Sequence, residues 1–135
     1  MEPLAAQSAL KLQISMPNDP LTVITDADKL RQVLVNLVGN AVKYTKAGTI
    51  QVELSDGDGR VTIRVRDSGV GIRPEDLPHI FEPFWQVDRT QRSMDGGTGL
   101  GLSVVQRMVE LLRGEVTVES QVGVGSTFTV SLPKK

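Results

Sequence analysis

Hydrophobic and polar residues alternate in several short stretches of the chain, which is the pattern of strands with one buried face. The first stretch is Leu10 to Met16, and a short strand is expected at Thr22 to Thr25. Two alternating runs, at residues 50–54 and 61–65, flank a turn-forming tetrad at residues 56–59 and predict a hairpin. A second hairpin is predicted near the C-terminus, with arms at Val116 to Val118 and Phe128 to Leu132 joined through Gly123 and Gly125.

Two longer stretches place hydrophobic residues at the spacing of an amphipathic helix. The first begins at Asp26 or Asp28, either of which suits an N-cap, and stops before Gly48. The second runs from Leu100 to Leu112 and stops at Gly114, and a short helix is expected near Pro74. These elements predict an α+β fold, a two-layer α/β sandwich in which about three helices cover one face of a mixed, mostly antiparallel five-stranded sheet.

The composition fits one domain and excludes several kinds of site. A chain of 135 residues, 39% of them apolar, can bury one core, so a single domain over residues 1–135 is expected. The formal charge of -1 comes from 15 basic and 16 acidic residues spread along the chain, which favours neither nucleic acid nor anionic lipid as a partner. There is no cysteine, and the single histidine, His79, is too little for a histidine-based metal centre. No apolar run approaches the roughly 18 residues of a membrane span, and the first residues lack signal-peptide features, so no direct membrane contact is expected.

Three polar residues form one stripe on the first predicted helix. Asn36, Asn40 and Lys43 lie at i, i+4 and i+7, within about 60° of one another around the helix axis. The stripe borders the apolar face, so it could line a cleft. A solvated polar face is the common alternative for such a pattern, although asparagine is a poor helix former and two of them in mid-helix are unexpected.

A turn follows the first hairpin, with the sequence Asp67-Ser68-Gly69-Val70-Gly71. By itself such a sequence can be no more than a tight reversal. Alternatively, an ionised Asp67 at the floor of a pocket could accept a hydrogen bond from the exocyclic amine of adenine, while Gly69 and Gly71 let the backbone approach the ring. Such a pocket would favour ATP over GTP, because guanine carries a carbonyl oxygen where adenine carries its amine.

Glycines also precede the second predicted helix, in the run Gly96-Gly97-Thr98-Gly99-Leu100-Gly101. Its backbone N–H groups and the positive end of the helix dipole could hold phosphate oxygens. The run is neither a P-loop, because no Lys-Ser or Lys-Thr pair follows, nor a dinucleotide fingerprint, because no strand precedes it. A flexible linker is an equally good interpretation of this run alone. The irregular stretch from residue 67 to residue 98 nevertheless favours function, because long irregular segments in compact domains are usually functional.

Taken in order, these motifs resemble the boxes of the histidine kinase catalytic domain, which is related to type II topoisomerases and a major heat-shock chaperone. The resemblance spans Asp26 to Leu132. The five boxes are similar to residues 36–44 (N box), 67–71 (first glycine box), 81–84 (F box), 97–101 (second glycine box) and 123–127 (last box). The resemblance implies a Bergerat-type fold with an ATP site.

The resemblance also implies a role for each matching residue. Asn40 would be the metal ligand, giving its side-chain oxygen to Mg²⁺, with Asn36 assisting and Lys43 contacting phosphate; these three would be the catalytic residues. Tyr44 would pack beside the adenine, Phe81 and Phe84 would anchor a lid from about Trp85 to Thr98, and Arg89 and Arg92 in that lid would reach the γ-phosphate. The full set of nucleotide-contacting residues implied in this way is Asn36, Asn40, Lys43, Tyr44, Asp67, Gly69, Gly71, Ile72, Arg89, Arg92, Gly97, Thr98, Gly99, Leu100, Gly101, Leu102 and Thr127.

The function implied is that of a protein-histidine kinase catalytic domain in a two-component system, using ATP and Mg²⁺. Its partners would be ATP and ADP, the histidine-bearing dimerisation domain of the parent kinase, and a response regulator downstream. No acceptor motif precedes Asp26, and His79 lies beside the F box, where a structural or exposed role is expected. The domain would then be a cytoplasmic monomer that cannot autophosphorylate by itself, whether or not the parent kinase is anchored in a membrane.

Two other functions remain open from the sequence. The domain could bind nucleotide as a regulatory module without transferring phosphate. It could also be an ATPase of the topoisomerase branch, which Asn36 disfavours because that branch has a water-activating glutamate four residues before the Mg²⁺ asparagine.

Overall fold

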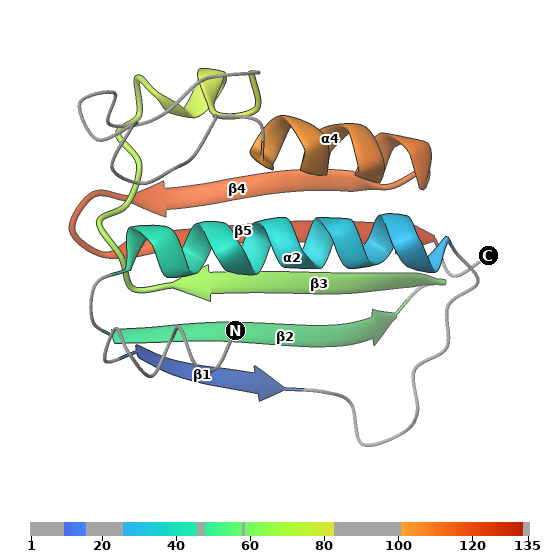
Figure 1. Cartoon of the computed structure of the whole chain (residues 1–135), viewed down its shortest axis with the longest axis horizontal. Coiled ribbons are helices and arrows are strands. Elements are labelled where there is room, and N and C mark those ends of the chain that lie inside the picture. Colours follow the sequence, from blue (N-terminus) through green and yellow to red (C-terminus); the bar gives the residue numbers. More distant parts are fainter. Residues whose placement is uncertain (1–9, 16–25, 46–47, 58, 83–100, 134–135) are drawn as a thin grey trace.

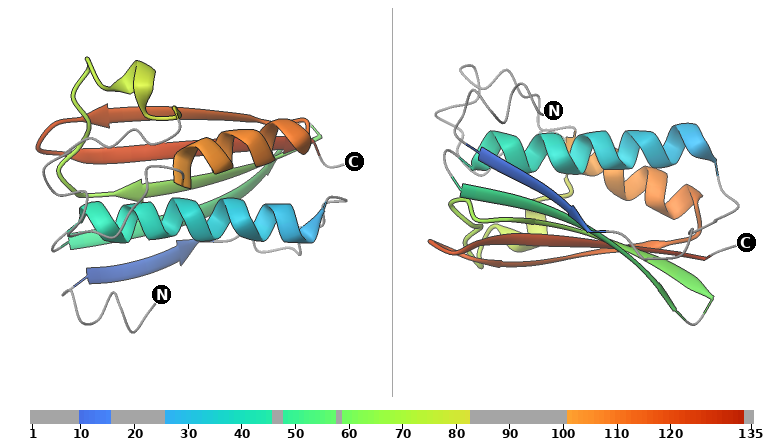
Figure 2. Two further views of the ribbon diagram at one scale, coloured as in Figure 1. Left: turned by 45° about the horizontal axis from the view of Figure 1, so that its top comes forward. Right: turned by 90° about the horizontal axis from the view of Figure 1, so that it is seen from below.

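The part of the chain that the structure describes forms one five-stranded sheet with two α-helices on the same face (Figures 1 and 2). A computed structural model describes residues 10–15, 26–45, 48–57, 59–82 and 101–133. The strands follow the spatial order β1-β2-β3-β5-β4, with β1 parallel to β2 and all other neighbours antiparallel. In chain order the elements are β1 (Leu10–Ser15), α2 (Ala27–Tyr44), β2 (Gly48–Gly57), β3 (Arg60–Asp67), the 3-10 helix η1 (Leu77–His79), α4 (Gly101–Leu111), β4 (Glu115–Gln121) and β5 (Gly125–Pro133).

The two α-helices bury one stripe each against the sheet. Asp26 caps α2, because its Oδ1 accepts hydrogen bonds from the N–H groups of Asp28 (3.0 Å) and Lys29 (3.2 Å). The buried residues of α2, Val33, Leu37 and Ala41, recur every four positions and therefore lie on one side of the helix. Val105 and Val109 do the same for α4, and the two helices pack side by side over the central strands.

The sheet is buried on one face only. Along β3 and β5 every second residue points into the core, and the buried set includes Ile63, Val65, Phe128 and Val130. The residues between them point to the other side, which carries polar side chains and which we call the open face. This alternation is what period-two patterning predicts for a sheet covered on one side.

The predicted fold class is confirmed, with differences at the level of elements. Within the described residues the helical layer contains two α-helices and one short 3-10 helix, where about three helices were expected. The strand expected at Thr22 to Thr25 lies outside the described residues. The arms of the second hairpin are longer than the pattern indicated, because polar residues continue both strands toward the turn. No helix in the described part of the chain is both long and apolar enough to cross a membrane.

Gly114, where the second predicted helix stops, does not take the left-handed conformation. Arg113 takes it instead, with φ 65°. A side-chain carbon at Gly114 would lie 2.4 Å from the carbonyl oxygen of Ser131. Glycine is therefore required there because the helix end passes close to β5.

Candidate functional site

Three chain segments meet at one end of the sheet. They are the C-terminal end of α2, the turn that follows β3, and the turn between β4 and β5 (Figure 1). Val70 donates its N–H to the carbonyl of Tyr44 (3.3 Å), and Gly123 donates its N–H to the carbonyl of Val70 (3.0 Å). Main-chain hydrogen bonds thus tie α2 to one turn and that turn to the next.

Asp67, the last residue of β3, places a carboxyl group at this junction. Its side chain points toward the helical layer and the residue is only 6% exposed. Oδ1 accepts hydrogen bonds from the N–H groups of Gly69 (2.9 Å) and Ser126 (3.3 Å). Burial raises the pKa of the Asp67 carboxyl above its usual value, and the two N–H donors oppose that rise. The second carboxyl oxygen of Asp67, Oδ2, can therefore accept a hydrogen bond from a ligand.

The glycines of this turn are needed for close packing within the protein. A side-chain carbon on Gly69 would lie 2.3 Å from the carbonyl oxygen of Tyr44 and 3.0 Å from Oδ1 of Asp67. Gly71 has φ 79°, and a side-chain carbon there would lie 2.3 Å from the carbonyl oxygen of Gln121. The sequence had suggested that both glycines make room for a ligand. In the structure the space beside them holds protein atoms.

The polar stripe of α2 lies beside the core and is half-buried. Asn36, Asn40 and Lys43 all have intermediate exposure, so they do not form the fully solvated face that was the alternative. The side-chain nitrogen of Asn36 is buried without a hydrogen-bond partner among the described residues, and so is the hydroxyl of Thr45. An unpaired buried polar group costs about 1–3 kcal/mol, which a polar ligand or a water molecule could relieve.

The polar side chains of α2 at this site fit a phosphate-bearing ligand better than a metal ion held by the protein alone. Among the described residues there is no group of three or more histidine, cysteine, aspartate or glutamate side chains that could hold a metal ion. Mg²⁺ commonly takes only one or two protein oxygens and completes its shell with phosphates and water. The amides of Asn36 and Asn40 are compatible with that mode. Lys43 Nζ lies 5.2 Å from the centre of the Tyr44 ring, at the same end of α2.

Ser126, the neighbour of the predicted nucleotide contact Thr127, lies beside Asp67. The register pairs Asp67 with Ser126 and Arg66 with Thr127 across β3 and β5. Ser126 is 6% exposed and its hydroxyl lies 2.7 Å from that of Ser120. Thr127 points to the open face. Alternation with the buried Phe128 was the signal that could have distinguished the two residues.

The remaining predicted residues fall into two groups. Ile72 is buried and donates its N–H to the Ser120 hydroxyl (2.7 Å), Gly101 is the exposed first residue of α4, and Leu102 packs against the core. The others lie outside the described residues: Arg89, Arg92, Gly97, Thr98, Gly99 and Leu100, together with Phe84 and the lid as a whole.

Of the residues expected to have structural roles in or near the F box, Phe81 and His79 are described. Phe81 packs edge-on against Phe128, with ring centroids 6.3 Å apart, so this residue of the F box contacts the core. His79 belongs to η1, where its Nδ1 lies 2.8 Å from Oε2 of Glu82. Its side chain is 43% exposed.

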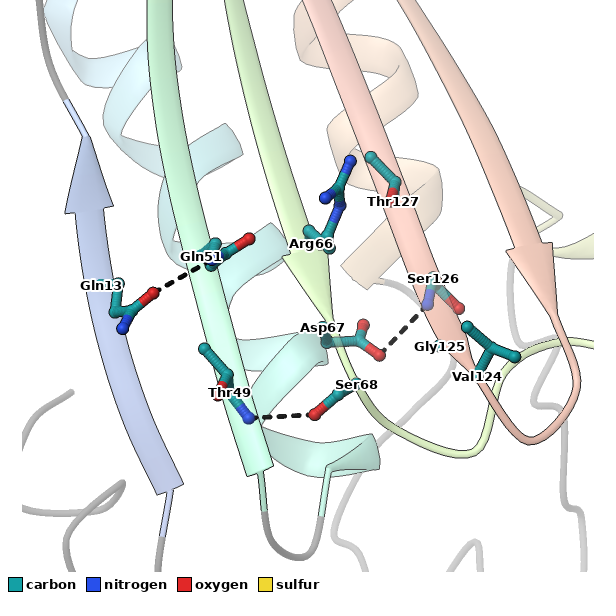
Figure 3. Close-up of a pocket in the computed structure, with 10 residues that line it drawn as sticks. All are labelled: Gln13, Thr49, Gln51, Arg66, Asp67, Ser68, Val124, Gly125, Ser126 and Thr127. Atoms are coloured by element: carbon teal, nitrogen blue, oxygen red, sulfur yellow. Dashed lines mark hydrogen bonds between the residues drawn. The ribbon is translucent and has the colours of Figure 1, made fainter.

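A separate polar hollow of about 470 Å³ lies mainly on the open face (Figure 3). Side chains from β1, β2, β3 and β5 line it, with Arg66 and Asp67 of β3 both in its middle part. None of the α2 residues contributes to the lining. We call it the open-face hollow; it shares Asp67, Gly125 and Ser126 with the junction but takes no residue from α2.

Known proteins match both the sequence and this arrangement. The family described as histidine kinase-, DNA gyrase B-, and HSP90-like ATPase matches residues 25–135. The chain belongs to this family. The autoinducer 2 sensor kinase/phosphatase LuxQ of Vibrio cholerae is 42% identical over 137 residues, covering 97% of this chain and 16% of LuxQ. The sensor histidine kinase RcsC of Escherichia coli K12 is 38% identical over 133 residues, covering 97% of this chain and 14% of RcsC. The chain therefore spans about one sixth of the length of the curated relatives it matches.

Solved structures narrow the family to its histidine kinase branch. The catalytic domain of the histidine kinase ThkA superposes with a TM-score of 0.84 at 30% identity, covering 98% of this chain and 84% of that one. Full-length ShkA in complex with AMPPNP gives a TM-score of 0.86 at 36% identity, covering 98% of this chain and 27% of ShkA. The chain is thus a catalytic domain of the histidine kinase type.

Proposed function

We propose that this domain binds ATP together with Mg²⁺ and donates the γ-phosphate to a histidine on a separate helical dimerisation domain of a sensor kinase. The observation that carries the proposal is the buried carboxyl of Asp67, which two backbone N–H groups hold in place at the junction of α2 with two turns. The ATP-analogue complex of ShkA, a structure with 36% identity, supports the same ligand class.

Asp67 would recognise the adenine base of the nucleotide. Its Oδ1 is already engaged by Gly69 and Ser126, so Oδ2 would accept the hydrogen bond from the exocyclic amine of adenine. A carbonyl oxygen in the same place, as in guanine, would face an acceptor in a poorly solvated site, which is repulsive. Ser126 would border the base, and Tyr44, at the end of α2, would pack beside it.

Asn40, assisted by Asn36, would hold the metal, and Lys43 would contact phosphate. When bound, Mg²⁺ neutralises charge on the phosphates, and phosphoryl transfer then depends mainly on positioning. Asn36 cannot activate water as a carboxylate does, which favours transfer to an acceptor residue over hydrolysis. The glycines 97, 99 and 101, with Thr98, Leu100, Leu102, Arg89 and Arg92, remain predicted phosphate-side contacts.

Calorimetry of the purified domain tests the nucleotide site. ATP should bind in a Mg²⁺-dependent manner and more tightly than GTP. Asp67→Asn should weaken ATP binding about tenfold or more, because a charged hydrogen-bond acceptor worth about 1.5–3 kcal/mol is replaced. Asp76→Asn is a matched control, since Asp76 is 5% exposed but pairs with Arg73 on the protein itself (3.1 Å). Unchanged ATP affinity in the Asp67 variant would refute the assignment of the base pocket.

A second experiment tests the metal and the transfer. Asn40→Ala should bind ATP without the gain that Mg²⁺ gives the wild type. The domain mixed with a cognate histidine-bearing dimerisation domain and labelled ATP should produce acid-labile phosphohistidine. If ATP binds but no label is transferred, the domain is a nucleotide-binding regulatory module; rapid steady-state hydrolysis by the domain alone would instead identify an ATPase.

A further inference from the structure

The open-face hollow crosses four adjacent strands, from β1 to β5 (Figure 3). Three strand spacings give it a length of about 14 Å. An extended polypeptide advances about 3.3 Å per residue, so the hollow has room for about four residues. It is too long for a simple ion to fill.

Arg66, near the centre of the hollow, differs from the other arginines on the same face of β3. Arg64 forms an ion pair with Glu53 (N–O distance 3.1 Å), and Arg60 donates to the hydroxyl of Ser131 (2.7 Å). Arg66 makes no ion pair with any residue that the structure describes, and its side chain is exposed. A guanidinium group with its donors unused is suited to a carboxylate, which it can bind through two parallel hydrogen bonds.

The flanking side chains can bind a main chain on either side of Arg66. The amide of Gln51 donates to Oε1 of Gln13 (3.0 Å), which leaves the nitrogen of Gln13 as a donor and the oxygen of Gln51 as an acceptor. The Ser68 hydroxyl accepts the N–H of Thr49 (2.9 Å) and retains its own proton to donate. A peptide presents alternating donors and acceptors, so this mixed lining matches it.

We propose that the open-face hollow binds an acidic polypeptide segment in extended conformation, with one carboxylate on Arg66. The surrounding carboxyl groups leave room for one added carboxylate and disfavour a run of phosphates, because Asp67 lines the hollow and the exposed Glu53 and Glu119 occupy the same face on either side. This site is on the opposite side of the sheet from the Asn36 and Asn40 stripe. The hollow shares Asp67 and Ser126 with the proposed base pocket, but Arg66, on which this proposal depends, has no part in that pocket.

Titration of the isotope-labelled domain, followed by NMR, tests the proposal. The probe is a blocked pentapeptide of small polar residues with one central glutamate, and its partner has glutamine in that place. The glutamate peptide should shift the backbone signals of Gln51, Arg66 and Thr127 in a saturable way. The glutamine peptide should bind about fivefold more weakly, which corresponds to about 1 kcal/mol for a partly exposed ion pair.

Arg66→Gln should remove the difference between the two peptides, while the matched control Arg64→Gln should preserve it. Both positions are exposed on one strand, so an unchanged spectrum elsewhere confirms that each variant is folded. Three results would overturn the proposal: no saturable shift at millimolar peptide, equal affinity for both peptides, or the same shifts with inorganic phosphate alone. The last result would identify a plain anion site instead.

Discussion

The substitution Gly69→Ala should destabilise the domain strongly, although alanine adds a single methyl group. That methyl would lie 2.3 Å from the carbonyl oxygen of Tyr44, 2.8 Å from Oγ1 of Thr45 and 3.0 Å from Oδ1 of Asp67. Relief requires the turn to move away from α2, which strains the hydrogen bond from Val70 to Tyr44 (3.3 Å). Overpacking costs about 1–3 kcal/mol and the hydrogen bond about 1 kcal/mol, so a loss of about 2–4 kcal/mol is expected.

Thermal unfolding measures this loss directly. A loss of about 3 kcal/mol corresponds to a fall in Tm of roughly 10 °C for a domain of this size. Gly39→Ala is the matched control, because Gly39 lies within α2 and an added side-chain carbon there meets nothing within 4 Å. That variant should gain up to about 1 kcal/mol from helix propensity. A Gly69→Ala variant as stable as the wild type would show that the junction is looser than the structure indicates.

Other substitutions probe the carboxyl group and the core. Because burial raises the pKa of Asp67 above its ordinary value of 3.8, the folded chain binds that proton more tightly than the unfolded chain. The carboxyl thus favours folding below pH 3.8, and this contribution is lost as the pH rises through the folded-state pKa. Asp67→Asn should therefore unfold at higher urea than the wild type at neutral pH, with the gain shrinking toward pH 4; a less stable variant at pH 7 would contradict this. Leu37 is a core residue, 1% exposed, and Leu37→Ala should lower the free energy of urea unfolding by about 2–5 kcal/mol. The control Leu111→Ala changes a residue of α4 that is 48% exposed and should lower it by less than about 1 kcal/mol. Similar losses in the two variants would mean that α2 does not pack as described.

The sequence predicted those helices and strands whose own residues show a regular spacing of hydrophobic side chains. The helical spacing of hydrophobic residues after Asp26 predicted α2, and the alternation in β3 identified both faces of that strand. The family resemblance, read from five short motifs in order, is confirmed by the match over residues 25–135. The nucleotide roles of individual residues stay predictions.

Features that depend on neighbours distant in sequence could not be predicted in the same way. The parallel pairing of β1 with β2 joins residues about forty positions apart, and it is what brings Gln13 to the open-face hollow. Nor does any local signal show that Gly71 packs against the β4–β5 turn or that Gly114 meets Ser131. Thr127 is a different case, because the alternation with Phe128 already indicated its direction.

The one-sided burial of the sheet separates two kinds of evolutionary constraint. Side chains directed at the helices must keep their volume and shape, since the core is closely packed. Those on the other side alternate with them along the same strands, yet they contribute little to that packing. Related catalytic domains can therefore differ in the charges of the open face, and in what binds there, while the buried core that supports the catalytic site stays the same.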